Sequence, residues 1–83
     1  MGEITYFVAL PFARTEDGDL VAGEALECQS AFRAVREAER LARKHAGAVA
    51  FSRSGDPSIG EFSDAEVIKR FGDLPSELFQ NVT

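Results

Sequence analysis

Apolar and small residues recur at intervals of three and four between Ser30 and Gly47, in the most regular pattern of the chain. The positions are Ala31, Ala34, Val35, Ala38, Leu41 and Ala42. This spacing is typical of a helix that buries one face. Ser30 can cap its first turn, and Gly47 is expected to end it. Because alanine predominates, we expect the helix to lie close to the surface that it covers, most simply a sheet.

Two strands are predicted before this helix. Residues 4–12 alternate, with one face formed by Ile4, Tyr6, Val8, Leu10 and Phe12. Pro11 cannot donate to a ladder, so we expect an edge or a bulge there. Asp17-Gly18 indicates a hairpin turn. Leu20–Cys28 then forms the returning strand, with imperfect alternation that indicates a bulge at Gly23.

Less regular patterns follow the helix. Ala48–Ser52 is predicted to be a third strand with Val49 and Phe51 as its inward residues. The next residues, up to Ser58, are rich in turn formers and indicate a loop. Residues 63–72 have two interpretations: a capped short helix, or a strand that pairs with Ala48–Ser52. The strand is favoured.

This order of elements predicts an α+β fold. It is a two-layer arrangement, with a mainly antiparallel sheet of three to four strands (β-β-α-β-β) covered by one main helix. The 83 residues contain no repeat and no linker, which predicts a single domain over 1–83. Residues 73–83 are interpreted as a docking tail with a turn of helix after Pro75. Leu78 and Phe79 in this tail are expected to dock on the chain's own core, or else on a partner.

Charge is distributed unevenly along the chain. Five basic and two acidic residues give Ser30–Gly47 a net charge of +3, whereas the rest of the chain carries −8 of the total of −5. The spacing of three and four places a basic stripe on one side of the helix, formed by Arg33, Arg36, Arg40 and Arg43. The stripe is either a solvated face with pairs such as Glu39–Arg43, or a surface that binds an anionic partner or a second copy of the chain.

Composition narrows the classes of function. The hydrophobic fraction of 45% favours a folded domain, and no apolar run approaches the roughly 20 residues of a membrane span. A single cysteine excludes an internal disulfide and fits a cytoplasmic protein. The net charge of −5 disfavours general binding to nucleic acid or to anionic membranes.

Catalytic and metal-binding patterns are weak. Cys28 and His45 would be separated by about 22 Å along the helix, too far apart for a catalytic dyad. One cysteine and one histidine do not suffice for a zinc site. Phosphate-binding and dinucleotide-binding motifs are absent from the sequence. We therefore expect no enzymatic activity, no metal and no cofactor.

One candidate ligand site lies in the loop expected after the third strand. Arg53, with the amides around Ser54 and Gly55, could bind a phosphate or carboxylate, and Asp56 completes this polar segment. The alternative is an ordinary loop in which Asp56 caps a turn before Pro57.

Two segments carry a resemblance. AGAVAFSRSGDPSIGEF (46–62) followed by FGDLP (71–75) resembles a family of small uncharacterised bacterial proteins. That resemblance implies no activity and no site. In layout alone, residues 6–12, residues 20–28 and the helix capped by Ser30 are similar to small strand–strand–helix–strand modules, which include HicB-type antitoxins and some nucleic-acid-binding domains.

Three hypotheses of function follow. The first is a non-enzymatic interaction module that associates with itself or with another protein. The second is a regulator that contacts nucleic acid through the basic stripe, although nucleic acid is not the expected partner of so acidic a chain. The third is binding of a small anionic ligand by Arg53–Asp56. No membrane partner is expected.

Overall fold

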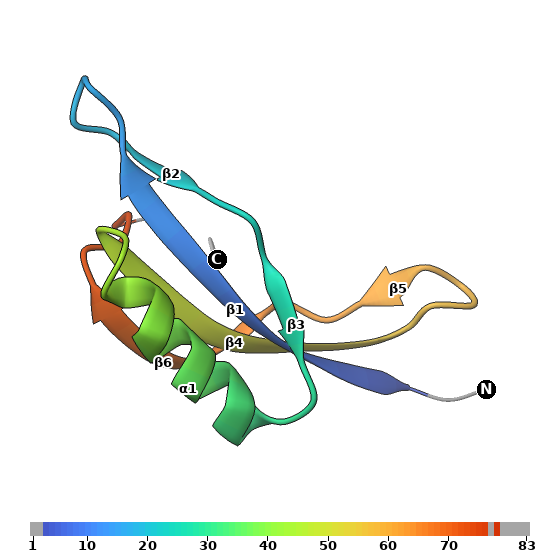
Figure 1. Ribbon diagram of the computed structural model, residues 1–83. Coiled ribbons are helices and arrows are strands. Elements are labelled where there is room, and N and C mark those ends of the chain that lie inside the picture. The colour runs from blue at the N-terminus through green and yellow to red at the C-terminus, as the bar shows by residue number, and fades with distance from the viewer. Residues whose placement is uncertain (1–2, 77, 79–83) are drawn as a thin grey trace.

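The structure is a computed structural model that describes residues 3–76 and 78. It has an α+β fold in which one helix lies against an antiparallel sheet (Figure 1). Within these residues the elements are β1 (Ile4–Arg14), β2 (Leu20–Ala22), β3 (Leu26–Cys28), α1 (Ala31–Ala42), β4 (Gly47–Asp56), β5 (Glu61–Phe62) and β6 (Glu66–Gly72).

The two long strands β1 and β4 form the centre of the sheet. They pair antiparallel from Ile4 opposite Gly55 to Phe12 opposite Gly47. Short β2 and β3 both pair with β1 on its outer side, and β5 and β6 both pair with β4. The described chain therefore has six strands rather than the expected three to four. One expected strand is interrupted into β2 and β3, and β5 was not predicted.

Proline explains the interruption between β2 and β3. The amide of Gly23 donates to the carbonyl of Pro11 at 2.8 Å. In an antiparallel ladder the N–H and C=O groups of one residue point to the same neighbouring strand. An N–H group at residue 11 would therefore also point toward the segment between β2 and β3. Proline has no N–H group, so the hydrogen-bond ladder between β1 and this segment is interrupted there. The expectation at Pro11 was an edge or a bulge, and the bulge is confirmed. β1 is a central strand, but between the pairs Phe12–Ala22 and Ala9–Leu26 the neighbouring segment has one residue more than β1, at Gly23, where a bulge was also expected.

The helix begins where the sequence predicts and ends earlier. The Ser30 hydroxyl accepts from the Arg33 amide at 3.2 Å, which confirms the N-cap. The last helical residue is Ala42, with Arg43 as the C-cap, rather than a residue next to Gly47. The amides of Arg43 and Lys44 donate three residues back, to Arg40 and Leu41, which tightens and closes the final turn.

Gly47 is required for close packing rather than for a helix cap. It opens β4 opposite Gly72, and the backbone of Asp73 occupies the position that a Cβ atom of residue 47 would take. The Asp73 amide donates to the carbonyl of Ala46 at 2.9 Å, which holds the end of β6 beside the start of β4. This contact between residues 46 and 73 is long-range, so the local sequence could not reveal it.

Alanines form the contact between helix and sheet, as the sequence predicts. Ala34 and Ala38 of α1 are fully buried against Ala9 of β1 and Ala48 and Ala50 of β4. Because the side chain of alanine is a single methyl group, the helix axis can approach the sheet closely. The partly buried apolar residues around this core are Phe7, Leu26, Cys28, Val35, Ala42 and Phe71.

The opposite face of the sheet is also apolar. Because side chains alternate along β4, Val49 and Phe51, which were expected to be its inward residues, point away from the helix. Val49 is nevertheless fully buried and Phe12 is 5% exposed, so part of this face is also shielded from solvent. After β6 the amide of Leu78 donates to the carbonyl of Pro75 at 3.2 Å, which closes a turn at the place where a turn of helix was expected. Leu78 is half-buried, and Phe79 lies outside the described residues.

Two segments after the helix are strands, one of which was expected to be a loop. Residues 66–72 form β6, which confirms the favoured interpretation. Arg53–Asp56 was expected to lie in a loop, and this was wrong, because it forms the last part of β4. The polar composition of this part favours a loop, but its backbone pairs with the start of β1 and therefore stays extended. There the hydroxyls of Thr5 and Ser54 share a hydrogen bond of 2.8 Å.

Candidate functional site

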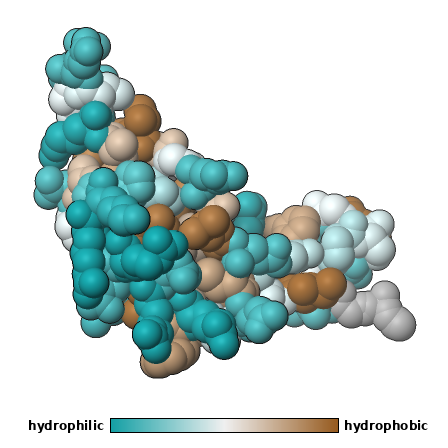
Figure 2. Space-filling model, in the orientation of Figure 1, coloured by the Kyte–Doolittle hydropathy of each residue, from teal (hydrophilic) through white to brown (hydrophobic). Residues whose placement is uncertain are grey.

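One cavity of the described structure is an open groove between β3 and the first half of α1. Leu26 and Cys28 lie opposite Ala9 and Phe7 of β1, so their side chains lie on the helix side of the sheet. The helix packs chiefly over β1 and β4 and only lightly on β3. A groove of about 810 Å³ therefore remains beside β3. Figure 2 shows apolar surface there next to the polar surface of the helix.

Phe32 stands at the mouth of this groove and is the largest exposed apolar side chain on the helix. It is 69% exposed and lines the groove. The guanidinium of Arg36 lies over its ring, 5.6 Å from the centroid. The sequence pattern did not single out Phe32, although one signal was present. It is a large aromatic residue beside a stripe of small residues rather than part of it.

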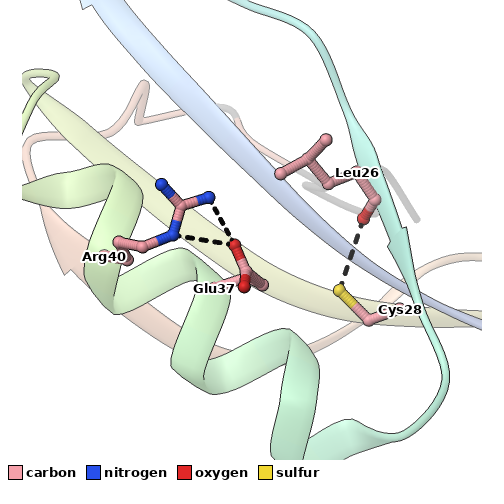
Figure 3. A network of polar contacts seen from close by, with 4 residues as sticks. All are labelled: Leu26, Cys28, Glu37 and Arg40. Carbon is pink, nitrogen blue, oxygen red and sulfur yellow. Dashed lines mark hydrogen bonds and ion pairs between the residues drawn. The ribbon is translucent and has the colours of Figure 1, made fainter.

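The basic stripe has different roles along its length. All four arginines are exposed, but only Arg33 and Arg36 line the groove. Arg40 forms an ion pair with Glu37, with its Nη2 atom 2.6 Å and its Nε atom 3.0 Å from Oε1 (Figure 3). In the described part of the chain this pair takes the place of the expected Glu39–Arg43 pair. Arg33 and Arg36 thus present their charge beside Phe32, and the carboxylates of Glu27 and Glu37 also belong to the lining of the groove.

Cys28 lies on the sheet side of the groove. Its Sγ atom donates to the carbonyl of Leu26 at 3.6 Å (Figure 3). Burial raises the pKa of the Cys28 thiol, and the nearby Glu37 carboxylate raises it further. A thiol with a raised pKa is a weak nucleophile at neutral pH. The whole of α1 separates Cys28 from His45, as expected, so the two do not form a dyad.

The other predicted site, Arg53–Asp56, has its polar groups directed at neighbours within the chain. Arg53 donates from Nε to the carbonyl of Ser63 at 2.8 Å, and its guanidinium lies 5.8 Å from the ring centroid of Phe62. Gly55 is buried against Phe62. The carboxylate of Asp56 accepts from the amide and hydroxyl of Ser58, so Asp56 does cap a turn.

These hydrogen bonds set the electrostatics of Asp56. The Ser58 hydroxyl, and then its amide, lower the pKa of the exposed Asp56 carboxyl. The adjoining shallow cavity of about 510 Å³ includes the carboxylates of Glu3, Asp56 and Glu61 in its lining. Negative charge there opposes binding of an anion, so this geometry gives little support to an anionic-ligand site. The anionic-ligand site stays a prediction.

Metal clusters and membrane-spanning helices are both missing from residues 3–76 and 78. No group of three or more His, Cys, Asp or Glu residues in this part of the chain is placed to hold a metal ion. No helix among the same residues is long and apolar enough to cross a membrane.

Comparison with known proteins gave no match. No protein-family model matches the chain, and no curated protein and no solved structure matches it. The resemblance of residues 46–62 and 71–75 to small bacterial proteins therefore stays a prediction. The function is accordingly inferred from the geometry of the molecule alone.

Proposed function

We propose that this protein is a non-enzymatic interaction module that associates with a second copy of itself. Its binding surface is the groove between β3 and α1, whose lining includes Leu26, Cys28, Phe32, Arg33 and Arg36 together with the carboxylates of Glu27 and Glu37. It is called the basic groove here because Glu37 is paired with Arg40, so Arg33 and Arg36 outnumber the remaining carboxylate of Glu27. The observation that carries the proposal is Phe32. A phenylalanine that is 69% exposed, stacked under an arginine and beside an open groove, gains most when another surface covers it.

The composition of the basic groove favours protein binding. Aromatic residues and arginine are enriched at protein interfaces, and buried aromatic anchors contribute most of the binding energy there. Phe32 provides the anchor, while Leu26 and Cys28 provide an apolar wall. Arg33 and Arg36 select a partner of negative charge.

Charge determines which surface of a second copy fits. Two α1 helices packed directly on each other would bring two basic stripes together, and like charges would oppose that contact. The chain outside the helix region is strongly acidic, at −8 against +3. We therefore expect the basic groove of one copy to face an acidic surface of the other, in a closed dimer with two equal contacts.

The sheet edges are less suited to self-association. The register of β6 shifts opposite Ala50 and Phe51, so Ile68 is bulged, and Lys69 and Arg70 follow it. Bulges and charged residues are common devices that prevent edge pairing. The edge of β3 is only three residues long, and a symmetric pairing there would oppose Glu27 with its copy.

Light scattering over a range of protein and salt concentrations tests this proposal. We expect a mass that rises from one chain toward two as protein concentration increases at low salt, and that falls again as salt screens the contact. Arg33→Glu/Arg36→Glu should remain monomeric, whereas the matched control Lys69→Glu/Arg70→Glu should associate like the wild type. A wild-type mass of one chain under all conditions would overturn the proposal.

A second candidate is a regulator that contacts nucleic acid. The observation in its favour is that Arg33, Arg36, Arg40 and Arg43 are all exposed on one helix. Gel retardation of a labelled duplex and of a single strand at low salt tests it. Binding that falls steeply with salt and is lost in Arg33→Ala/Arg36→Ala supports this candidate. Absence of retardation at low salt removes it.

A further inference from the structure

We infer that the acidic surface bound by the basic groove is the turn between β1 and β2 of the second copy. This turn, residues 15–19, is here called the acidic turn. The inference builds on the proposed self-association and goes further, because it names the segment that occupies the groove.

The acidic turn is well ordered by hydrogen bonds. The amide of Thr15 donates to the carbonyl of Asp19 at 2.8 Å, and the amide of Gly18 donates to Thr15 at 2.9 Å. Gly18 has a φ of 90°, which glycine adopts readily. Arg14 donates to the Gly18 carbonyl at 2.7 Å. A turn that is ordered before binding loses little conformational entropy when it docks.

The chemistry of the acidic turn complements the basic groove. Glu16, Asp17 and Asp19 are exposed and lie within four consecutive positions. Val21, two residues after Asp19, is 47% exposed. One segment therefore offers carboxylates for Arg33 and Arg36 together with an apolar side chain that can cover Phe32.

The position of the acidic turn makes the contact intermolecular. Figure 1 shows that the hairpin of β1 and β2 projects beyond the body of the molecule, at the end away from the first residues of α1. The molecule extends 44 Å along its longest axis. The acidic turn therefore does not reach the groove of its own chain, but it is free to enter that of a second copy. A twofold axis makes both contacts at once.

The hairpin of β4 and β5 is the main rival occupant. It also joins an exposed apolar residue, Ile59, to acidic residues. However, the Asp56 carboxylate already accepts two hydrogen bonds from Ser58, and the positive charge of Arg53 lies against Phe62. The acidic turn has the higher density of exposed carboxylates, so it is the occupant that charge favours.

A mixing experiment with two charge-reversed chains tests the inference. Glu16→Lys/Asp17→Lys makes the acidic turn basic, and Arg33→Glu/Arg36→Glu makes the groove acidic. Each variant alone opposes like charges, so we expect its dimer dissociation constant to rise about tenfold or more. In the mixture each turn meets a groove of opposite charge, and a heterodimer should form. Circular dichroism verifies that each variant is folded.

The matched control is Glu61→Lys/Asp64→Lys, which makes the same change in charge near β5 and should leave self-association unchanged. If this control dissociates the dimer and Glu16→Lys/Asp17→Lys does not, the inference is overturned while self-association stands. The inference is also overturned if the two reversed variants remain monomeric when mixed. A wild type that is monomeric throughout overturns the proposed function itself, so the two failures are distinguishable.

Discussion

The guanidinium of Arg36 lies 5.6 Å from the ring centroid of Phe32, and the phenylalanine is nevertheless 69% exposed. A cation over an exposed ring contributes only about 0.5–1 kcal/mol. The pair therefore does little for the stability of the single chain. It does hold an apolar ring and a positive charge in a fixed relation at the mouth of the basic groove, which is what a docking partner would recognise.

Replacement of Phe32 by alanine should weaken self-association without changing the stability of the fold. For Phe32→Ala we expect a change in the free energy of unfolding within about 0.5 kcal/mol, because the side chain is exposed. Self-association should weaken by about tenfold or more, as for an interface anchor. Thermal unfolding and light scattering measure the two effects. Ile59→Ala, another exposed apolar site, should change neither, and equal weakening by both variants would contradict a specific role for Phe32.

The alanine contact between helix and sheet should not tolerate a larger residue. Ala38 is fully buried against the sheet, so Ala38→Leu should lower the free energy of unfolding by about 1–3 kcal/mol through overpacking. Chemical denaturation measures this change. Ala25→Leu adds the same atoms at an exposed position and should have little effect. Full stability of Ala38→Leu would show that the helix does not lie so close to β4.

Gly47 and Gly18 should respond to alanine for different reasons. A Cβ atom at residue 47 meets the backbone of Asp73, whereas one at residue 18 meets open space. Gly18→Ala should cost about 1–2 kcal/mol through its positive φ alone. Gly47→Ala must displace backbone, so we expect the larger loss in denaturant unfolding. The reverse order would contradict the close contact between Gly47 and the backbone of Asp73.

The pKa of Asp56 reports on the turn after β4. The Ser58 hydroxyl is the main cause of its lowered value, so Ser58→Ala should raise the pKa of Asp56 toward that of a free aspartate. A carboxyl with a lowered folded-state pKa stabilises the fold at neutral pH, and this contribution disappears as the pH falls through that pKa. Carboxyl-carbon NMR titration measures the shift. An unchanged pKa in Ser58→Ala, or an equal shift in Ser63→Ala, would contradict this hydrogen bond.

Local sequence patterns predicted the elements whose signals are local. The alanine stripe and Ser30 located the start and buried face of α1, and the alternation of residues 66–72 favoured the strand that forms β6. The ends of elements depended on distant residues. Arg53–Asp56 continues β4 because it pairs with the first residues of β1, and Gly47 serves a contact with Asp73 rather than a helix cap.

The candidate site was only partly predictable for the same reason. Periodicity identified Arg33 and Arg36 as exposed basic residues. It could not show that α1 lies chiefly over β1 and β4 and covers β3 only in part, because that position depends on tertiary packing. The groove, and the significance of Phe32 at its mouth, arise from this offset.

Alkylation of Cys28 tests the central claim most directly, because this thiol lines the basic groove. The rate constant for its reaction with iodoacetamide should fall as the concentration of the wild-type protein increases, since a second copy covers the groove. In Arg33→Glu/Arg36→Glu the rate constant should be independent of protein concentration, whatever its absolute value. A wild-type rate constant that does not change with protein concentration would contradict the account.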